Sequence, residues 1–191
     1  MWDLLALGYH VVSRLAYAVG VGVAITLQKR HQYFTRAVGI EAGYRRFRRL
    51  AAIVMNNDAL SFIVLCLVTR GMLDTSIPRA ALVSIGLAGI ALGAGTKLWA
   101  AATLGSSGYH WQDVFDPSAT ASGPPRGPYR LLRNPMYTVG YLHAYGFALV
   151  TSSWIGLLAA AFDQAAILLF HQLVEKPHFL RTSAGQVQRD R

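Results

Sequence analysis

The 191-residue chain lacks most of the features by which soluble domains are stabilised or bind metals. Cys66 is its only cysteine, so the chain cannot form an intrachain disulfide, and C-x-x-C zinc sites are absent. Charged residues make up only 14% of the sequence, below the roughly 25% of ordinary soluble domains. Acidic residues are scarcest, with 9 Asp or Glu against 18 Lys or Arg. This composition excludes a disordered chain and argues against a soluble globule.

Apolar residues are abundant instead, at 53% of the chain. The formal net charge of +9 raises the question of nucleic acid. A nucleic-acid surface, however, spreads Lys and Arg over polar sequence interleaved with aromatic residues. Here the basic residues gather in short islands between long apolar runs. The sequence therefore predicts an integral membrane protein whose partner is the lipid bilayer, with no nucleic acid partner.

Five apolar stretches predict an all-α, multi-pass transmembrane bundle that forms one domain over residues 1–191: 4–27, 50–68, 80–102, 136–150 and 154–174. At 1.5 Å per residue the third is about 35 Å long, enough to cross a hydrocarbon core of about 30 Å. The fourth is short and stops just before Trp154, so the last two stretches are predicted to form a helical hairpin. His10 and Arg14 lie in the first stretch, which leaves open an arrangement of four spans with an interfacial N-terminal helix.

Lys and Arg alternate between the loops. The first loop holds seven, the second two, the third three, the hairpin turn none and the C-terminal tail four. Fourteen of these residues therefore belong to one set of alternate loops and two to the other. The positive-inside rule then places the first loop, the third loop and the tail in the cytosol, and the N-terminus outside.

Several polar or small residues within the apolar stretches need an explanation. Gly89 and Gly93 have G-x-x-x-G spacing, which favours close helix packing, although a ligand near the backbone and a homo-oligomer both stay open. Lys97 either reaches the cytosolic interface or faces such a ligand. Asp58 is expected to pair with Arg14 or Lys97 inside the bundle. Asp163 is expected to lie in water near the outer end of the hairpin.

Residues 103–135 are polar, aromatic and rich in Gly and Pro, as expected of a functional or disordered loop. Three blocks stand in order around the predicted hairpin: Leu104, Gly105 and Gly108 leading to Asp113 and Phe115; then Asn134, Pro135, Met136 and Tyr137; then Glu175, Lys176, Pro177, His178 and Phe179. In order and spacing they resemble the phosphatidylethanolamine N-methyltransferase family. This family lies within the membrane-embedded methyltransferases that include isoprenylcysteine carboxyl methyltransferase. The likeness is strongest over residues 84–180.

The resemblance implies methyl transfer from S-adenosylmethionine, without a metal, to the amino headgroup of a phospholipid at the cytosolic face. Phosphatidylethanolamine and its methylated forms are the implied acceptors. The implied cofactor contacts are Ala91, Leu92, Gly93, Pro128, Tyr129, Arg133, Asn134, Pro135, Tyr137, Glu175 and Lys176. Two of these depart from the family pattern: Ala91 replaces a glycine and Lys176 replaces a glutamate. No G-x-G-x-x-G follows a strand-like segment, so a Rossmann cofactor domain has no support.

A lipid amine must be neutral to attack a methyl group, so a proton acceptor within hydrogen-bond reach is expected. The candidate catalytic residues are Asp113, Tyr137 and His143, and the candidate substrate contacts are Tyr109, His110 and Asp113. A lone helical histidine such as His143 is also compatible with a packing role. Two other functions stay open: methylation of a prenylcysteine carboxylate or a small thiol on the same scaffold, and a non-catalytic membrane protein that binds lipid.

Overall fold

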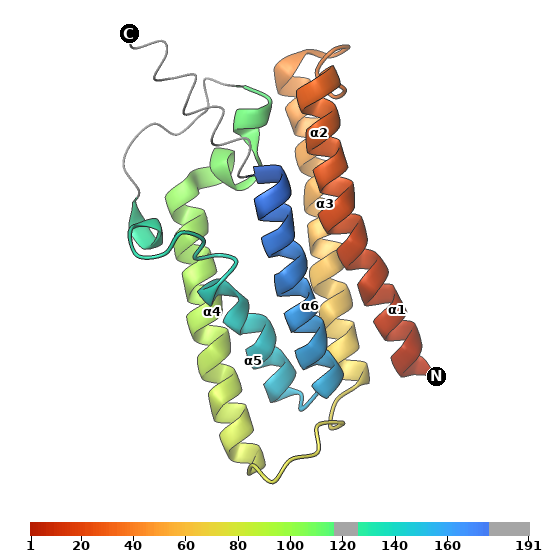
Figure 1. The fold of residues 1–191 in the computed structure, drawn as a ribbon, viewed down its shortest axis with the longest axis vertical. Coiled ribbons are helices and arrows are strands. Elements are labelled where there is room, and N and C mark those ends of the chain that lie inside the picture. The colour runs from red at the N-terminus through yellow and green to blue at the C-terminus, as the bar shows by residue number, and fades with distance from the viewer. Residues whose placement is uncertain (117–125, 176–191) are drawn as a thin grey trace.

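The computed structural model describes residues 1–116 and 126–175, except for the side chains of residues 106–109 and of Glu175. Throughout these residues the chain forms helices and turns and no strand. The helices lie side by side in a bundle (Figure 1). The predicted all-α helical bundle is therefore confirmed.

The N-terminal half is a long helical hairpin. Its first arm is one continuous rod made of α1 (Trp2–Leu15), a π-helical turn η1 (Ala16–Gly20) and α2 (Val21–His31). Its second arm, α3 (Gly39–Val68), returns along this rod (Figure 1). The Gln28 side chain closes the turn, because its amide oxygen accepts the Phe34 N–H at 3.0 Å and its amide nitrogen donates to Thr35 Oγ1 at 2.9 Å. Both ends of the buried amide are thus satisfied, which fixes where the chain reverses.

The C-terminal half begins with α4 (Arg79–Tyr109), which packs along α5 (Leu142–Val150). The chain then reverses into α6 (Trp154–Phe170), continued by a π-helical turn η6 (His171–Glu175). In Figure 1, α6 stands between α5 and the N-terminal hairpin. The predicted hairpin of the last two apolar stretches is therefore present as α5 and α6.

The turn of this second hairpin joins both halves of the molecule. Ser153 caps α6 by accepting the Gly156 N–H at 2.8 Å, and its hydroxyl also lies 2.5 Å from Thr69 Oγ1 just after α3. Arg79 at the start of α4 donates hydrogen bonds to Ser152 Oγ and to the Val150 carbonyl. The backbone of the α3–α4 loop contributes too, because Gly71 N–H and Leu73 N–H donate to the Thr151 and Ser152 carbonyls at 2.9 and 2.8 Å.

The connection from α4 to α5 is irregular. Gly105 has φ +70°, a left-handed conformation that favours glycine, and it interrupts α4 before His110. Tyr137 and Thr138 both donate backbone hydrogen bonds to the Asn134 carbonyl, at 3.1 and 3.0 Å. The predicted fourth stretch therefore becomes helical later than residue 136. Three short 3-10 helices complete the described connection: η2 (Gln112–Val114), η4 (Gly127–Arg130) and η5 (Val139–Tyr141).

Four helices among the described residues are long and apolar enough to cross a membrane: Trp2–His31, Gly39–Val68, Arg79–Gly105 and Trp154–Val174. The remaining apolar stretch forms the shorter helix Val139–Val150. The N-terminal rod packs along α3, with His10 and Arg14 buried. It is thus built as a helix of the bundle and not as a separate interfacial helix.

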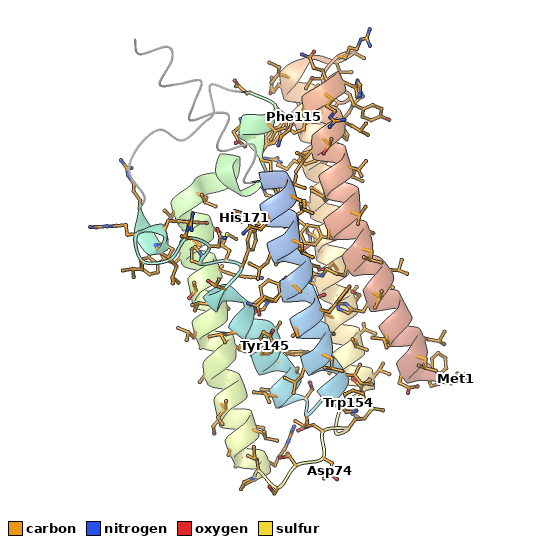
Figure 2. All side chains as sticks on the ribbon, viewed as in Figure 1. Met1, Asp74, Phe115, Tyr145, Trp154 and His171 are labelled. Atoms are coloured by element: carbon orange, nitrogen blue, oxygen red, sulfur yellow. The ribbon has the colours of Figure 1, made fainter. Side chains whose placement is uncertain are left out.

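The connections divide between two ends of the bundle. Figure 2 shows Phe115 at one end and Met1, Asp74 and Trp154 at the other. The α2–α3 turn lies at the Phe115 end in Figure 1. The connections that are rich in Lys and Arg therefore share one end, as the alternation in the sequence requires.

Candidate functional site

A cavity of about 500 Å³ lies inside the bundle, within the size range of small-molecule sites. Ala59 and Ile63 of α3 form part of one wall, and Ile90 and Ala94 of α4 form part of another. Ala59 and Ile63 are also exposed. In the fold, α3 packs against α1 and α6, α6 also packs against α5, and α5 packs against α4. The cavity therefore lies among these helices, with α3 and α4 on two of its sides.

A buried charged cluster lines part of this cavity. Arg14 Nε donates to Asp163 Oδ1 at 2.7 Å, and Arg14 Nη2 lies 2.7 Å from Asp58 Oδ2. All three side chains are almost fully buried. An ionisable group within a span is costly unless it is paired, so the guanidinium holds α1, α3 and α6 at this level.

The pairing of Asp58 with Arg14 confirms one expectation, and the position of Asp163 corrects another. Asp163 is 2% exposed and lies inside the bundle, whereas the sequence placed it in water at the outer end of the hairpin. Its partner, Arg14, is 149 residues away in the chain. The spacing along α6 carries no sign of such a partner, and this is why the expectation was wrong.

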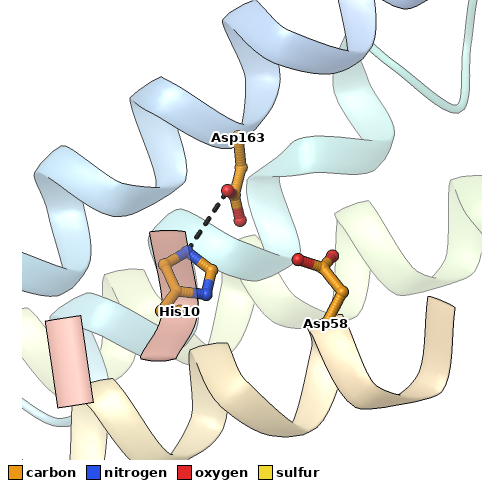
Figure 3. A group of neighbouring side chains, drawn as sticks. All are labelled: His10, Asp58 and Asp163. Atoms are coloured by element: carbon orange, nitrogen blue, oxygen red, sulfur yellow. Dashed lines mark ion pairs between the residues drawn. The ribbon is translucent and has the colours of Figure 1, made fainter. Parts of the chain in front are cut away.

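His10 completes the cluster. Figure 3 shows His10, Asp58 and Asp163 pointing toward one another from three helices. His10 Nε2 lies 3.2 Å from Asp163 Oδ1, and His10 Nδ1 lies 3.0 Å from Ser61 Oγ. One ligand atom from each of the three residues lies within 4.8 Å of the others, and these are ligand types that metals use. The guanidinium of Arg14 already occupies both carboxylates, so Arg14 supplies the positive charge at this place.

His143 and Lys97 line the cavity from α5 and α4. His143 Nδ1 lies 2.5 Å from the Gly140 carbonyl oxygen. Because a carbonyl only accepts hydrogen bonds, Nδ1 carries a proton, and the lone pair of a neutral ring is then on Nε2. Lys97 Nζ lies 4.9 Å from the centroid of the Tyr141 ring, a cation–π contact. The cavity thus combines a potential proton acceptor with a cation.

Close packing of α4 on α5 determines where His143 lies. A Cβ added at Gly93 would collide with the backbone nitrogen of His143 and would come 2.9 Å from the Gly140 carbonyl. A Cβ at Gly89 would lie 3.2 Å from the Leu142 carbonyl. The G-x-x-x-G pair is therefore used for helix packing within the chain, the first of the interpretations offered by the sequence.

The cavity brings together three of the site residues predicted from the sequence: His110, Tyr137 and His143. Ala91 and Leu92 are exposed and do not line it. The other predicted residues that lie outside its lining are Gly93, Asp113, Pro128, Tyr129, Arg133, Asn134 and Pro135. Glu175 ends η6, whereas its side chain, that of Tyr109 and the whole of Lys176 lie outside the described residues.

Charged residues and Tyr141 also line the cavity and were not among the predicted site residues; the charged ones are Arg14, Asp58, Lys97 and Asp163. Their signal in the sequence is a charge or hydroxyl within an apolar stretch, which in a membrane helix indicates a functional position. That signal does not say which of the helices meet. Only the packing of α1, α3 and α6 brings the charges into one cavity.

Comparison with known proteins gives a consistent set of relatives. The sequence model of a family described as phospholipid methyltransferase matches residues 82–182. A phosphatidylethanolamine N-methyltransferase of Chaetomium globosum is 30% identical over 92% of this chain and 20% of that protein. One from Coccidioides posadasii is 27% identical over 94% of this chain and 19% of that protein. The chain thus spans about a fifth of the length of such relatives. No solved structure matches it.

Proposed function

Because the chain belongs to the phospholipid methyltransferase family, we propose that it transfers methyl groups from S-adenosylmethionine to the amino headgroup of a phospholipid. Phosphatidylethanolamine and its methylated forms are the proposed acceptors. The observation that carries this proposal is the cavity between α3 and α4. There Tyr137, from the Asn-Pro-Met-Tyr motif, shares a lining with His110 and His143.

The chemistry of the cavity suits both ligands. S-adenosylmethionine supplies a methyl group on a sulfonium, whose carbon–sulfur bond breaks with the electron pair left on sulfur as the amine nitrogen bonds to the methyl carbon. Besides the sulfonium it carries an ammonium and a carboxylate, so its site needs charges of both signs. Arg14 and Lys97 supply positive charge to the cavity lining, and Asp58 supplies negative charge.

The protein's own contribution is positioning and proton transfer. His143 accepts the proton of the headgroup ammonium at Nε2, because Nδ1 is engaged by the Gly140 carbonyl. Met55, Ile90 and Phe147 line the same cavity, and such apolar walls exclude water and hold the acceptor near contact distance. We propose that the lipid enters from the bilayer past the exposed residues Ala59 and Ile63 of α3.

The cofactor contacts implied by the family likeness remain part of the proposal. His110 and Trp111, which follow α4 in the chain, line the cavity. Glu175, whose backbone ends η6, and Lys176, the next residue in the chain, remain proposed cofactor contacts. Arg133 and Asn134 stand in the preceding motif.

We assign the Phe115 end of the bundle to the cytosol. Fourteen of the eighteen Lys and Arg residues belong to the connections and tail of this side by the alternation in the sequence. The N-terminus is then outside. This orientation suits an enzyme that takes its methyl donor from the cytosol and its acceptor from the adjoining leaflet.

A labelled-methyl assay tests the proposed function. Protein in nanodiscs is supplied with methyl-labelled S-adenosylmethionine and either phosphatidylethanolamine, its monomethyl or dimethyl form, or a prenylcysteine. We expect label in the phospholipids only. If only prenylcysteine were labelled, the methyl acceptor would be prenylcysteine and not a phospholipid. No transfer together with no calorimetric binding of S-adenosylhomocysteine would contradict both enzyme assignments.

A further inference from the structure

We propose that Asp58 binds the ammonium group of a zwitterionic ligand in the cavity, and that Lys97 on the opposite wall binds the anionic group of the same ligand. The proposal rests on the proposed function, because the phospholipid headgroup and the methionine part of the methyl donor are both zwitterions. It adds specific residues in the N-terminal half and in α4 that the family motifs do not include.

The first observation is a carboxylate oxygen with unused bonding capacity. Asp58 is 4% exposed, and its Oδ2 is engaged by Arg14 at 2.7 Å. Among the described residues, none donates a hydrogen bond to Asp58 Oδ1, although that atom is buried. A buried carboxylate oxygen that has lost water without gaining a donor costs free energy. Because Asp58 lines the cavity, a ligand donor arriving there would recover that cost.

The second observation is the distribution of charge around Asp58. Arg14 is shared between two carboxylates, because it contacts Asp58 and Asp163 at 2.7 Å each. Two carboxylates, those of Asp58 and Asp163, thus share one guanidinium. His10 also contacts Asp163, on the side of the cluster nearest α1. The part of the cluster that faces the cavity through Asp58 therefore favours a cation.

The third observation is a cation on the other wall. Lys97 lines the cavity from α4, with Nζ 4.9 Å from the Tyr141 ring centroid. Within the described part of the chain Lys97 forms no ion pair, whereas Arg14 forms two. An ammonium held over an aromatic ring keeps its donors for an anionic group such as phosphate or carboxylate. Asp58 and Lys97 thus present opposite charges from α3 and α4, as a zwitterion requires.

Binding measurements without turnover test the proposal and separate the two ligands. Dioctanoyl phosphatidylethanolamine and dioctanoyl phosphatidylglycerol are titrated into the protein without methyl donor, and S-adenosylhomocysteine is titrated separately. If the lipid headgroup is the ligand, Asp58→Asn lowers phosphatidylethanolamine affinity by about 10- to 100-fold and leaves phosphatidylglycerol unchanged, as expected for one charged hydrogen bond. If the methyl donor is the ligand, the same loss appears only for S-adenosylhomocysteine.

Asp163→Asn is the matched control, because it also removes one carboxylate partner of Arg14. We expect it to leave the preference for phosphatidylethanolamine over phosphatidylglycerol, and the affinity for S-adenosylhomocysteine, close to wild type. Lys97→Met should weaken phosphatidylethanolamine and phosphatidylglycerol alike if it holds the phosphate. Equal affinities in Asp58→Asn and Asp163→Asn for all three ligands would overturn the proposal.

A measurement on the unaltered protein covers the case in which Asp58→Asn does not fold. Solid-state NMR with a ¹⁵N-labelled headgroup or ¹⁵N-labelled S-adenosylhomocysteine should show dipolar dephasing of an aspartate ¹³Cγ signal. Absence of dephasing with both bound ligands would also overturn the proposal. Because neither experiment involves turnover, a protein that binds the zwitterion but transfers no methyl group would contradict the proposed function and leave this inference intact.

Discussion

Two kinds of interface hold the helices of the molecule together. Buried ion pairs join α1 and α3 to α6, with Arg14 between Asp58 and Asp163. Backbone contact joins α4 to α5, because Gly89 and Gly93 leave no room for a side chain. In lipid the hydrophobic effect gives helices no reason to associate, so polar pairing and close packing are the available means. The cavity lies where these two kinds of interface meet.

The two kinds of interface also have different roles, because one can bind a ligand and the other positions a side chain. Close backbone contact is geometrically exact but leaves nothing for a ligand to bind. An ion-pair cluster costs desolvation free energy and retains atoms such as Asp58 Oδ1 that can bind a further group. The α4–α5 interface thus positions His143, while the cluster on α1, α3 and α6 supplies the two carboxylates of the cavity lining.

Loss of the shared guanidinium should have the largest effect. Arg14→Leu leaves the buried Asp58 carboxylate unpaired and Asp163 with His10 alone, and we expect it to lower the free energy of unfolding by about 3–5 kcal/mol. Denaturation by sodium dodecyl sulfate in mixed micelles measures this change. Arg45→Leu is the control, because Arg45 pairs with Glu41 at the surface. If Arg14→Leu lowered the free energy of unfolding no more than Arg45→Leu, the buried ion pairs would not be what joins α1 and α3 to α6.

The next largest effect concerns chemistry in the C-terminal half. His143→Gln removes the proton acceptor and should lower kcat for methyl transfer by about 100-fold or more while KM for the lipid changes little. The control is Tyr145→Phe on the same helix, which removes a hydrogen bond to Gln164 outside the cavity lining. A kcat for His143→Gln equal to that of Tyr145→Phe would assign His143 to packing.

The glycine interface provides a smaller and more local test. Gly93→Ala forces a methyl group against α5, and we expect the free energy of unfolding to fall by about 1–3 kcal/mol. Gly95→Ala is the matched control on the same helix, since a Cβ at Gly95 meets no described atom within 4 Å. The same micelle titration applies to both. Equal stability of the two variants would show that α4 and α5 can separate at little cost.

Of the four substitutions, the one at the junction of the two halves should have the smallest effect. Ser153→Ala removes the cap of α6 and the hydroxyl contact with Thr69, and the expected loss is about 1 kcal/mol. Ser84→Ala, at an exposed position of α4, is the control. Thermal unfolding in detergent resolves the difference. A loss at Ser153 as large as that at Arg14 would mean that the halves depend on their junction more than on the cluster.

Local sequence patterns were sufficient to predict the helices but not to predict which residues line the site. Apolar length and the alternation of Lys and Arg predicted the helices, the α5–α6 hairpin and the grouping of connections at two ends. The sequence did not predict which motif residues line the cavity. Tyr137 and His143 line it, whereas Ala91 and Leu92 are exposed and lie outside its lining. A position on a helix of known sequence does not reveal which face meets a neighbouring helix.

The sequence by itself determined the bundle, because hydrophobic length and positive charge act along the chain and need no partner. The tertiary structure alone decided that Asp163 is buried, since its partner Arg14 lies on a helix at the other end of the chain. It also decided that Asp58 and Lys97 face one cavity from opposite walls. Pairing energies depend on distance in space, and a sequence records only distance along the chain.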